Sequence, residues 1–335
     1  MSINIPPLTK NESGEERTVG FELEFAGLEL SRTAEIVQES FGGEIIEGSR
    51  YEYSIENTEL GDFRVELDAV ILQKMASKNL FENFGLDIDT GKLGNSIEDV
   101  LDKMAKSVVP TEIVMPPVKL TDIERLETLQ MQLQKNKAEG TKTSLIHAFG
   151  MHLNIECPSL DTDTLLAYLR SFLLLYPWLL EKLNVDITRR ISPFVDPFPD
   201  AYVNKVLDPV YQPDRNTFMN DYLQFNDTRN RPLDMMPIFG LLDEERTRKA
   251  LGGEKNNPRP TFHYRLPNSK IDEPGWKFSG EWNDWCEVEK LAVNTEMLTK
   301  LSKLYLLRRR KTLVSFKKEW SETVAIMLDL EVREI

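Results

Sequence analysis

The sequence predicts an α+β fold in which a curved, mainly antiparallel sheet carries helices on one face. Short segments that alternate apolar and polar residues recur along the chain, as in strands with one buried face. Helical segments lie between them without the regular alternation of a parallel sheet, and the last third, from Glu281 on, is mainly helical. No repeat or Gly/Ser-rich linker divides the chain. We therefore expect one domain over residues 18–335, preceded by a frayed polar tail over residues 1–17.

The signals at segment ends place the individual elements. Ser31 begins a helix near residues 32–41, and two glycines end it. The capping box that starts at Thr121 opens a second helix, which ends near Gly140. Further strands are expected near residues 44–47, 50–55 and 62–70.

A leucine-rich helix capped by Asp161 covers residues 165–183. It contains Arg170 and Pro177 and ends in two charged residues, so we expect a buried, kinked helix and no membrane span. The proline-rich residues 191–216 predict an ordered but irregular excursion.

Composition excludes several classes of protein. The chain has 335 residues, 41% of them hydrophobic, which is enough for a sizeable core. Its formal charge of −14 argues against nucleic-acid binding through a basic field. Two cysteines cannot build a disulfide framework, and no signal peptide is visible, so we expect a cytoplasmic protein with no membrane partner.

The segment Gly20-Phe21-Glu22-Leu23-Glu24-Phe25 is the most informative one. Glu22 and Glu24 fall on one face of a strand, about 7 Å apart. Two carboxylates at this spacing repel each other unless water or cations lie between them, and hard divalent cations prefer oxygen ligands. A solvated edge strand is the alternative explanation for this motif alone.

Four more segments repeat this arrangement of one apolar and one polar face. Their polar residues are Arg64, Glu66 and Asp68; Glu112; His152, Asn154 and Glu156; and His263 and Arg265. If these strands are neighbours, the polar faces form a bowl of metal ligands with a cationic rim. The alternative is that the strands are dispersed and each polar face is solvated.

Such a bowl suits nucleotide-dependent chemistry. Carboxylates and imidazoles hold Mg²⁺ or Mn²⁺ at phosphate oxygens, while arginines neutralise the transferred phosphoryl group. No P-loop, no H-E-x-x-H metalloprotease motif and no G-x-S-x-G elbow is present in the sequence.

In order and spacing, these motifs resemble the amidoligase family, carboxylate–amine ligases with a glutamine-synthetase-like fold. The matching pieces are Gly20 to Glu24, Val65 to Asp68, Glu112 to Pro116, Gly150-Met151-His152-Leu153-Asn154, and Asn230 to Pro237. One departure is His263 two residues before Arg265, where the family usually has glutamate.

The resemblance implies an ATP-dependent ligase that joins a small-molecule or peptide carboxylate to an amine through an acyl phosphate. It implies a role for each candidate residue. The divalent ions would be bound by Glu22, Glu24, Glu66 or Asp68, Glu112, His152 and, in place of glutamate, His263. Asn154 and Arg231 would contact ATP or substrate, Arg265 would stabilise the transferred phosphoryl group, and Arg190 is a further cationic candidate. His263 would shift the preference toward Mn²⁺.

Two alternatives to the ligase remain open at this point. A phosphotransferase on a related fold would use the same metals and arginines, and a non-catalytic relative would retain the sheet without turnover. Residues 191–216 or 245–260 would cover the site in an active enzyme.

Overall fold

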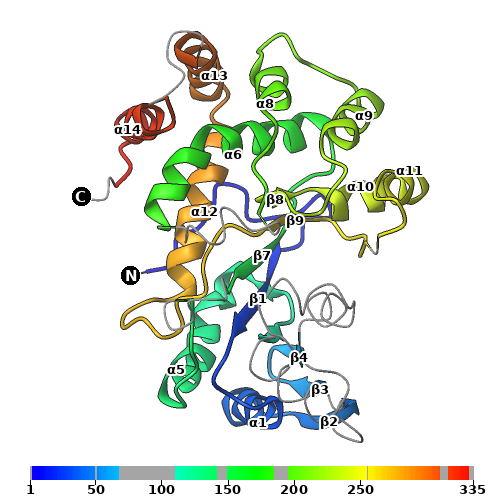
Figure 1. Cartoon of the computed structure of the whole chain (residues 1–335), viewed down its shortest axis with the longest axis vertical. Helices are drawn as coiled ribbons and strands as arrows, with labels where there is room; N and C mark the ends of the chain where they lie inside the picture. Colours follow the sequence, from blue (N-terminus) through cyan, green and yellow to red (C-terminus); the bar gives the residue numbers. More distant parts are fainter. Residues whose placement is uncertain are drawn as a thin grey trace, which may run out of the picture.

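The computed structural model describes residues 2–49, 51–67, 110–141, 149–184, 195–254, 256–309 and 316–331. Within these residues, nine strands form one open antiparallel sheet in the order β2-β3-β4-β5-β1-β7-β9-β8, and β6 pairs with β1 beside this path. The strands are β1 (Thr18–Phe25), β2 (Glu44–Ser49), β3 (Glu52–Thr58), β4 (Gly61–Leu67), β5 (Thr111–Val114), β6 (Val118–Lys119), β7 (Met151–Glu156), β8 (Leu233–Asp234) and β9 (Thr261–Tyr264) (Figure 1). The predicted α+β class is confirmed.

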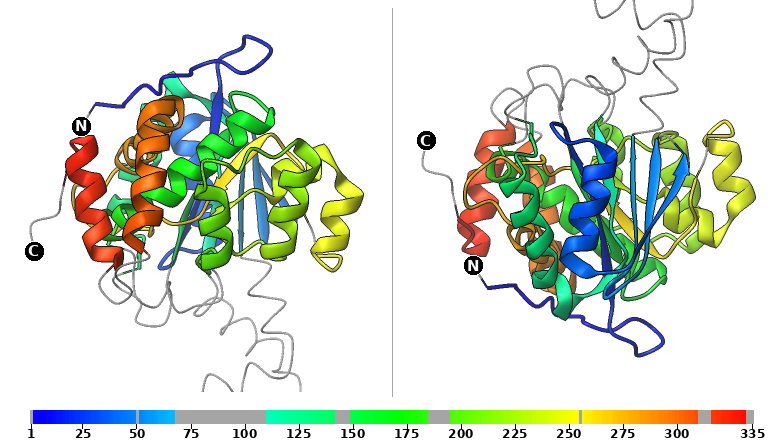
Figure 2. Two further views of the ribbon diagram at one scale, coloured as in Figure 1. Left: turned by 90° about the horizontal axis from the view of Figure 1, so that it is seen from above. Right: turned by 90° about the horizontal axis from the view of Figure 1, so that it is seen from below.

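The helices pack against the sheet and against each other. They are α1 (Leu30–Phe41), the 3₁₀ helix η1 (Leu120–Leu126), α5 (Glu127–Lys135), α6 (Thr162–Lys182), α8 (Asp200–Leu207), α9 (Arg215–Phe225), α10 (Met236–Leu242), α11 (Glu244–Ala250), α12 (Phe278–Val293), α13 (Thr295–Arg309) and α14 (Phe316–Leu328). Figure 2 shows α13 and α14, in orange and red, stacked outside α6, which both of them contact.

The apolar face of the sheet forms the core. Phe21, Leu23 and Phe25 of β1 are fully buried, as the period-two pattern predicts. The ring of Phe21 stacks on that of Phe278 at the start of α12, with 5.9 Å between the centroids. This side of the sheet is therefore covered by helices, and the polar side chains of the same strands face the other way.

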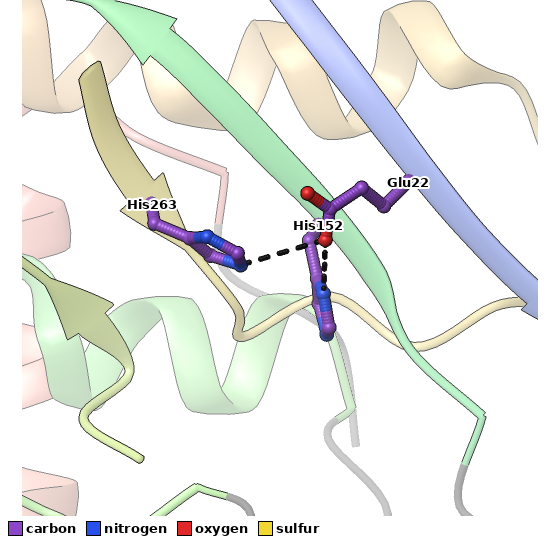
Figure 3. Close-up of side chains that lie close together, drawn as sticks. All are labelled: Glu22, His152 and His263. Carbon is purple, nitrogen blue, oxygen red and sulfur yellow. Dashed lines mark hydrogen bonds and ion pairs between the residues drawn. The ribbon is translucent and has the colours of Figure 1, made fainter. Parts of the chain in front are cut away.

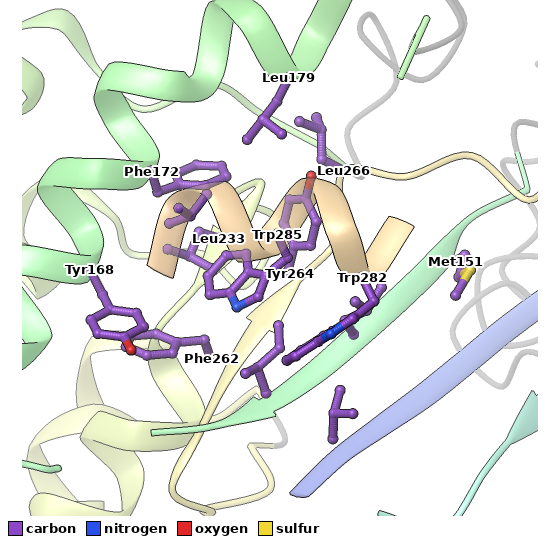
Figure 4. Packing of buried hydrophobic residues seen from close by; sticks show 14 of the residues in the cluster. Met151, Tyr168, Phe172, Leu179, Leu233, Phe262, Tyr264, Leu266, Trp282 and Trp285 are labelled. Atoms are coloured by element: carbon purple, nitrogen blue, oxygen red, sulfur yellow. The ribbon is translucent and has the colours of Figure 1, made fainter. Parts of the chain in front are cut away.

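Helices α6 and α12 cover the part of the sheet that carries the later strands. Figure 4 shows Trp285 of α12 against Tyr264 of β9, with their ring centroids 5.2 Å apart. Tyr168 of α6 stacks on Phe262 in the same strand, with 5.1 Å between the centroids. These contacts fix the orientation of β9, whose alternate residues point to the polar face.

Helix α6 has the predicted cap and is buried as predicted. The Asp161 side chain accepts a hydrogen bond from the Thr164 backbone N–H, and Pro177 lies inside the helix. Its leucines are buried on several sides, consistent with a helix in the protein core. None of the helices in the described ranges is long and apolar enough to cross a membrane.

The helix expected from Thr121 to Gly140 differs from the prediction. The chain forms η1 first, and the α-helix α5 begins only at Glu127 and ends at Lys135. Both the backbone N–H and the hydroxyl of Thr121 donate to the Glu16 carboxylate, at 3.2 and 2.9 Å. Thr121 is thus bonded to the N-terminal segment and does not cap a helix.

Residues 2–17, expected to be a frayed tail, are bonded to α12 near both ends of the segment. Trp282 donates its indole N–H to the Asn4 carbonyl at 2.9 Å. Arg17 is fully buried and forms an ion pair with Glu289 of α12 at 2.7 Å. This partner is far away in sequence, so local polarity gave no sign of it.

The proline-rich residues 191–216 are also more regular than predicted. In the part that the structure describes, they contain α8 and the first residues of α9. Arg170 of α6 donates to the carbonyl oxygens of Val206 and Tyr211, at 2.7 and 2.6 Å, and so fixes the connection between the two helices.

Candidate functional site

The strands with polar faces are neighbours in the sheet, as one of the two predicted alternatives requires. Glu112 of β5 lies directly opposite both Glu24 of β1 and Glu66 of β4. Glu22 lies opposite His152 of β7. Asn154 lies opposite His263 of β9, which in turn lies opposite Asp234 of β8. These polar side chains therefore lie opposite one another on adjacent strands.

Glu24, Glu112 and His152 form the first group of potential metal ligands in the described part of the chain. Each offers one ligand atom, and these atoms all lie within 4.8 Å of one another. His152 Nε2 lies 3.9 Å from Glu24 Oε1, while the other oxygen of Glu24 accepts the Gly150 backbone N–H at 2.6 Å. Two carboxylates and an imidazole suit Mn²⁺, Mg²⁺ or Zn²⁺.

Glu22, His152 and His263 form the second such group, shown in Figure 3. Both histidine rings point toward the Glu22 carboxylate. His152 Nδ1 lies 3.1 Å and His263 Nε2 3.7 Å from Glu22 Oε2. Asn154 Nδ2 donates to the other oxygen, Oε1, at 2.8 Å.

The environment of this second group shifts two pKa values in the same direction. Burial disfavours the Glu22 carboxylate, but neighbouring His263 and hydrogen bonds from His152 and Asn154 more than offset it, so its pKa lies well below the usual range. Burial and the charge of Arg265 lower the pKa of His263 well below its ordinary value, although Glu22 opposes this. Each shift favours the deprotonated form of its group.

Three arginines lie next to these groups, at the β8–β9 end of the sheet. Arg259 Nη2 donates to the Asn154 Oδ1 atom and lies 3.1 Å from His263 Nδ1. The guanidinium groups of Arg229 and Arg265 lie 3.5 and 4.0 Å from Asp234 Oδ2. Burial raises the pKa of Asp234, and the two arginines only partly oppose it. The carboxylate cluster thus adjoins a cationic one.

The structure brings most of the predicted residues together, with clear exceptions. Glu66 lies opposite Glu112 but pairs with Arg64, with 2.7 Å between Arg64 Nε and Glu66 Oε2. Arg231 instead donates to backbone carbonyls, those of Pro197 and Phe225, at 2.6 and 3.2 Å. These contacts hold the chain before β8 and give Arg231 a structural role. Asp68 and Arg190 lie outside the described residues.

Sequence reasoning missed Arg259 and Asp234. Arg259 lies between two prolines, in Pro258-Arg259-Pro260, just before β9. The two prolines restrict the backbone around Arg259, and a strand with polar residues follows directly. This combination could have marked Arg259 as a candidate site residue. Asp234 follows the arginine-proline motif at Arg231, but its strand has only two residues and shows no alternation.

Comparisons with known proteins agree with this arrangement. Residues 15–287 match a protein family described as "Putative amidoligase enzyme". No curated protein matches the chain, and no solved structure does. The match covers well over half of the chain and every residue of the two ligand groups. The chain therefore belongs to this amidoligase family.

Proposed function

We propose that the chain is an ATP-dependent carboxylate–amine ligase. The observation that carries the proposal is the meeting of two clusters on one face of the sheet. One holds carboxylates and imidazoles suited to divalent ions, and the other holds Arg229, Arg259 and Arg265. An enzyme that transfers the γ-phosphoryl group of ATP needs both, because the phosphates carry charge that metal ions and guanidinium groups neutralise together.

The residues present fit a divalent ion. The ligand atoms of Glu24, Glu112 and His152 are close enough to converge on one ion, and they are oxygen, oxygen and nitrogen. Glu24 is also held in place by the Gly150 N–H. When bound, Mg²⁺ or Mn²⁺ would neutralise and orient the phosphate oxygens of ATP.

The reaction would then proceed in two steps. An oxygen of the substrate carboxylate attacks the γ-phosphorus, the bond to the ADP oxygen breaks, and an acyl phosphate forms. The amine nitrogen next attacks the acyl carbon, inorganic phosphate leaves, and the amine loses a proton. Arg259 and Arg265 face the negative charge that develops in the first step, where a planar guanidinium binds phosphate oxygens in two places.

Binding is the first test. ATP is titrated by calorimetry into the protein with Mg²⁺, with Mn²⁺ and with EDTA, beside Glu24→Gln and a control variant, Glu44→Gln. Glu44 lies opposite Glu56 at the β2 edge, so its substitution makes the same charge change away from the site. We expect metal-dependent binding that Glu24→Gln loses and Glu44→Gln retains. No binding to the wild type under any metal would refute the proposal.

Hydroxylamine trapping is the second test, because it separates the ligase from a phosphotransferase. Pools of amino acids and dicarboxylic acids are incubated with ATP, metal and hydroxylamine. A ligase gives ADP, phosphate and a hydroxamate, since hydroxylamine intercepts the acyl phosphate. A phosphorylated acceptor that survives hydroxylamine, without released phosphate, would instead indicate a kinase.

A further inference from the structure

We propose that Glu22 is a hydrogen-bond acceptor and not a metal ligand, so that the Glu24–Glu112–His152 group alone holds the ion among the described residues. This inference rests on the proposed function, because it concerns the metal that the ligase needs. It follows from where the protons of the cluster lie. Three neighbours point N–H groups at Glu22, and two of them are fixed in that orientation by Arg259.

The Glu22 carboxylate already has a donor on each oxygen. Asn154 Nδ2 donates to Oε1 at 2.8 Å, and His152 Nδ1 lies 3.1 Å from Oε2. His263 Nε2 approaches the same Oε2 atom at 3.7 Å. An ion beside Glu22 would have to displace one of these donors in a site where the side chain is only 16% exposed.

The orientation of His152 follows from Glu22. An ionised carboxylate only accepts hydrogen bonds, so His152 Nδ1 carries the ring proton. With Nδ1 as the donor, Nε2 is the ring nitrogen left to face an ion, and it lies 3.9 Å from Glu24 Oε1. A carboxylate that holds one nitrogen while the other faces the metal is the usual arrangement around a ligating histidine. His152 would therefore bind an ion through Nε2, together with Glu24 and Glu112.

The orientation of His263 follows from Arg259. A guanidinium only donates, so His263 Nδ1, 3.1 Å from Arg259 Nη2, accepts with its lone pair. The ring proton is then on Nε2, a buried atom that makes no short hydrogen bond and points at Glu22. With one nitrogen accepting and the other protonated, the neutral ring has no lone pair left for an ion.

Arg259 also settles the orientation of Asn154. Because Arg259 donates to Asn154 Oδ1, the amide nitrogen must face Glu22. One guanidinium thus fixes two of the three donors around Glu22. Arg259 is a positioning residue for the metal site as well as a candidate phosphate contact.

The assignment changes the roles of two residues that the family resemblance makes metal ligands. Glu22 becomes the acceptor that orients His152, and His263 becomes a neighbour whose protonated Nε2 points at Glu22 from 3.7 Å. The histidine in place of glutamate then has no direct effect on the choice between Mg²⁺ and Mn²⁺.

Mn²⁺ alone, without nucleotide, is the probe for this inference. Its affinity is measured by calorimetry, and the nitrogen coupling of the bound ion by pulsed electron paramagnetic resonance. The proteins are the wild type and the Glu22→Gln, Glu24→Gln, His152→Gln and His263→Gln variants, with Glu44→Gln as the charge control. Unfolding in urea confirms that each variant is folded.

We expect Glu24→Gln to weaken Mn²⁺ binding more than about 100-fold. Glu22→Gln should weaken it only about 10-fold, because Glu22 orients a ligand through a hydrogen bond and does not itself bind the ion. The nitrogen coupling should persist in Glu22→Gln and His263→Gln and disappear in His152→Gln. Loss of the coupling in His263→Gln, or a loss of affinity in Glu22→Gln as large as in Glu24→Gln, would overturn the inference alone. A wild type that binds no Mn²⁺ would overturn the metal-dependent function as well.

Discussion

Neutralising Glu112 should change the stability of the protein in opposite directions with and without metal. Glu112 lies directly opposite Glu24 on one side and Glu66 on the other. Like charges that face each other across strands are destabilising, by about 0.2–1 kcal/mol for each pair. In EDTA, Glu112→Gln relieves two such pairs, so the free energy of unfolding should rise by about 0.5–2 kcal/mol.

With Mn²⁺ present, the order of stabilities should reverse. An ion that binds only the folded state adds about 2.7 kcal/mol when its concentration is 100 times the dissociation constant. The wild type should gain this amount, while Glu112→Gln should gain little, because it has lost one of the three ligands of the Glu24–Glu112–His152 group. Equilibrium urea unfolding in EDTA and in Mn²⁺ measures both differences.

Glu44→Gln is the matched control. It relieves the repulsion between exposed Glu44 and half-buried Glu56 and should raise stability slightly and equally in both buffers. Two results would refute the reasoning. A Glu112→Gln variant that is less stable than the wild type in EDTA would show that the carboxylate makes a structural contact worth more than the repulsion. Equal stabilisation of variant and wild type by Mn²⁺ would remove Glu112 from the metal site.

Three further predictions concern residues outside the metal group. Arg17→Met leaves Glu289 buried without its cation, so the free energy of unfolding measured in urea should fall by about 3–5 kcal/mol. A loss below about 1 kcal/mol would contradict the prediction that this buried ion pair stabilises the fold. Burial and the nearby Glu281 raise the pKa of Asp284 to about 7, against the modest effect of neighbouring lysines. Because the folded protein holds this proton more tightly than the unfolded chain does, the wild type loses stability as the pH rises from about 4 to 7. The gain from Asp284→Asn should thus be about 1–3 kcal/mol larger at pH 8 than at pH 5, and equal gains would refute the shift. Arg231→Lys should lower the free energy of unfolding by about 1–3 kcal/mol, because the contacts of Arg231 with backbone carbonyls are lost. The ATP affinity measured by calorimetry should stay within about two-fold of the wild type. A large loss of ATP affinity would show that Arg231 contributes to ATP binding.

The strands of the site were predictable because alternation carries its own spatial information. Glu22 and Glu24 must share a face once Phe21, Leu23 and Phe25 are buried, and the structure buries all three. The sequence left two alternatives open: the strands are neighbours with their polar faces together, or they are dispersed with each polar face solvated. Which residues lie opposite each other depends on register, and alternation within one strand does not specify it.

The arginines and the N-terminal segment were harder to predict for a different reason. A long guanidinium reaches its partner from a loop, where no periodicity applies, and Arg259 contacts Asn154 from 105 positions away. Arg17 meets Glu289 across 272 positions. In both cases the partner is chosen by the tertiary fold, so the surrounding sequence shows only a cation in a polar stretch.

His263 stands at the position where the resemblance described above leads one to expect a glutamate. A glutamate there would place another carboxylate beside Glu22, in a position where His263 is only 3% exposed. Burying like charges so close together is costly unless an ion compensates for them. A neutral imidazole avoids that cost and, held by Arg259, directs its Nε2 at Glu22 from 3.7 Å. Under the proposed assignment, His263 therefore adds no ligand on the Glu22 side, and an ion would lie at the Glu24–Glu112 side, where His152 Nε2 is 3.9 Å from Glu24 Oε1.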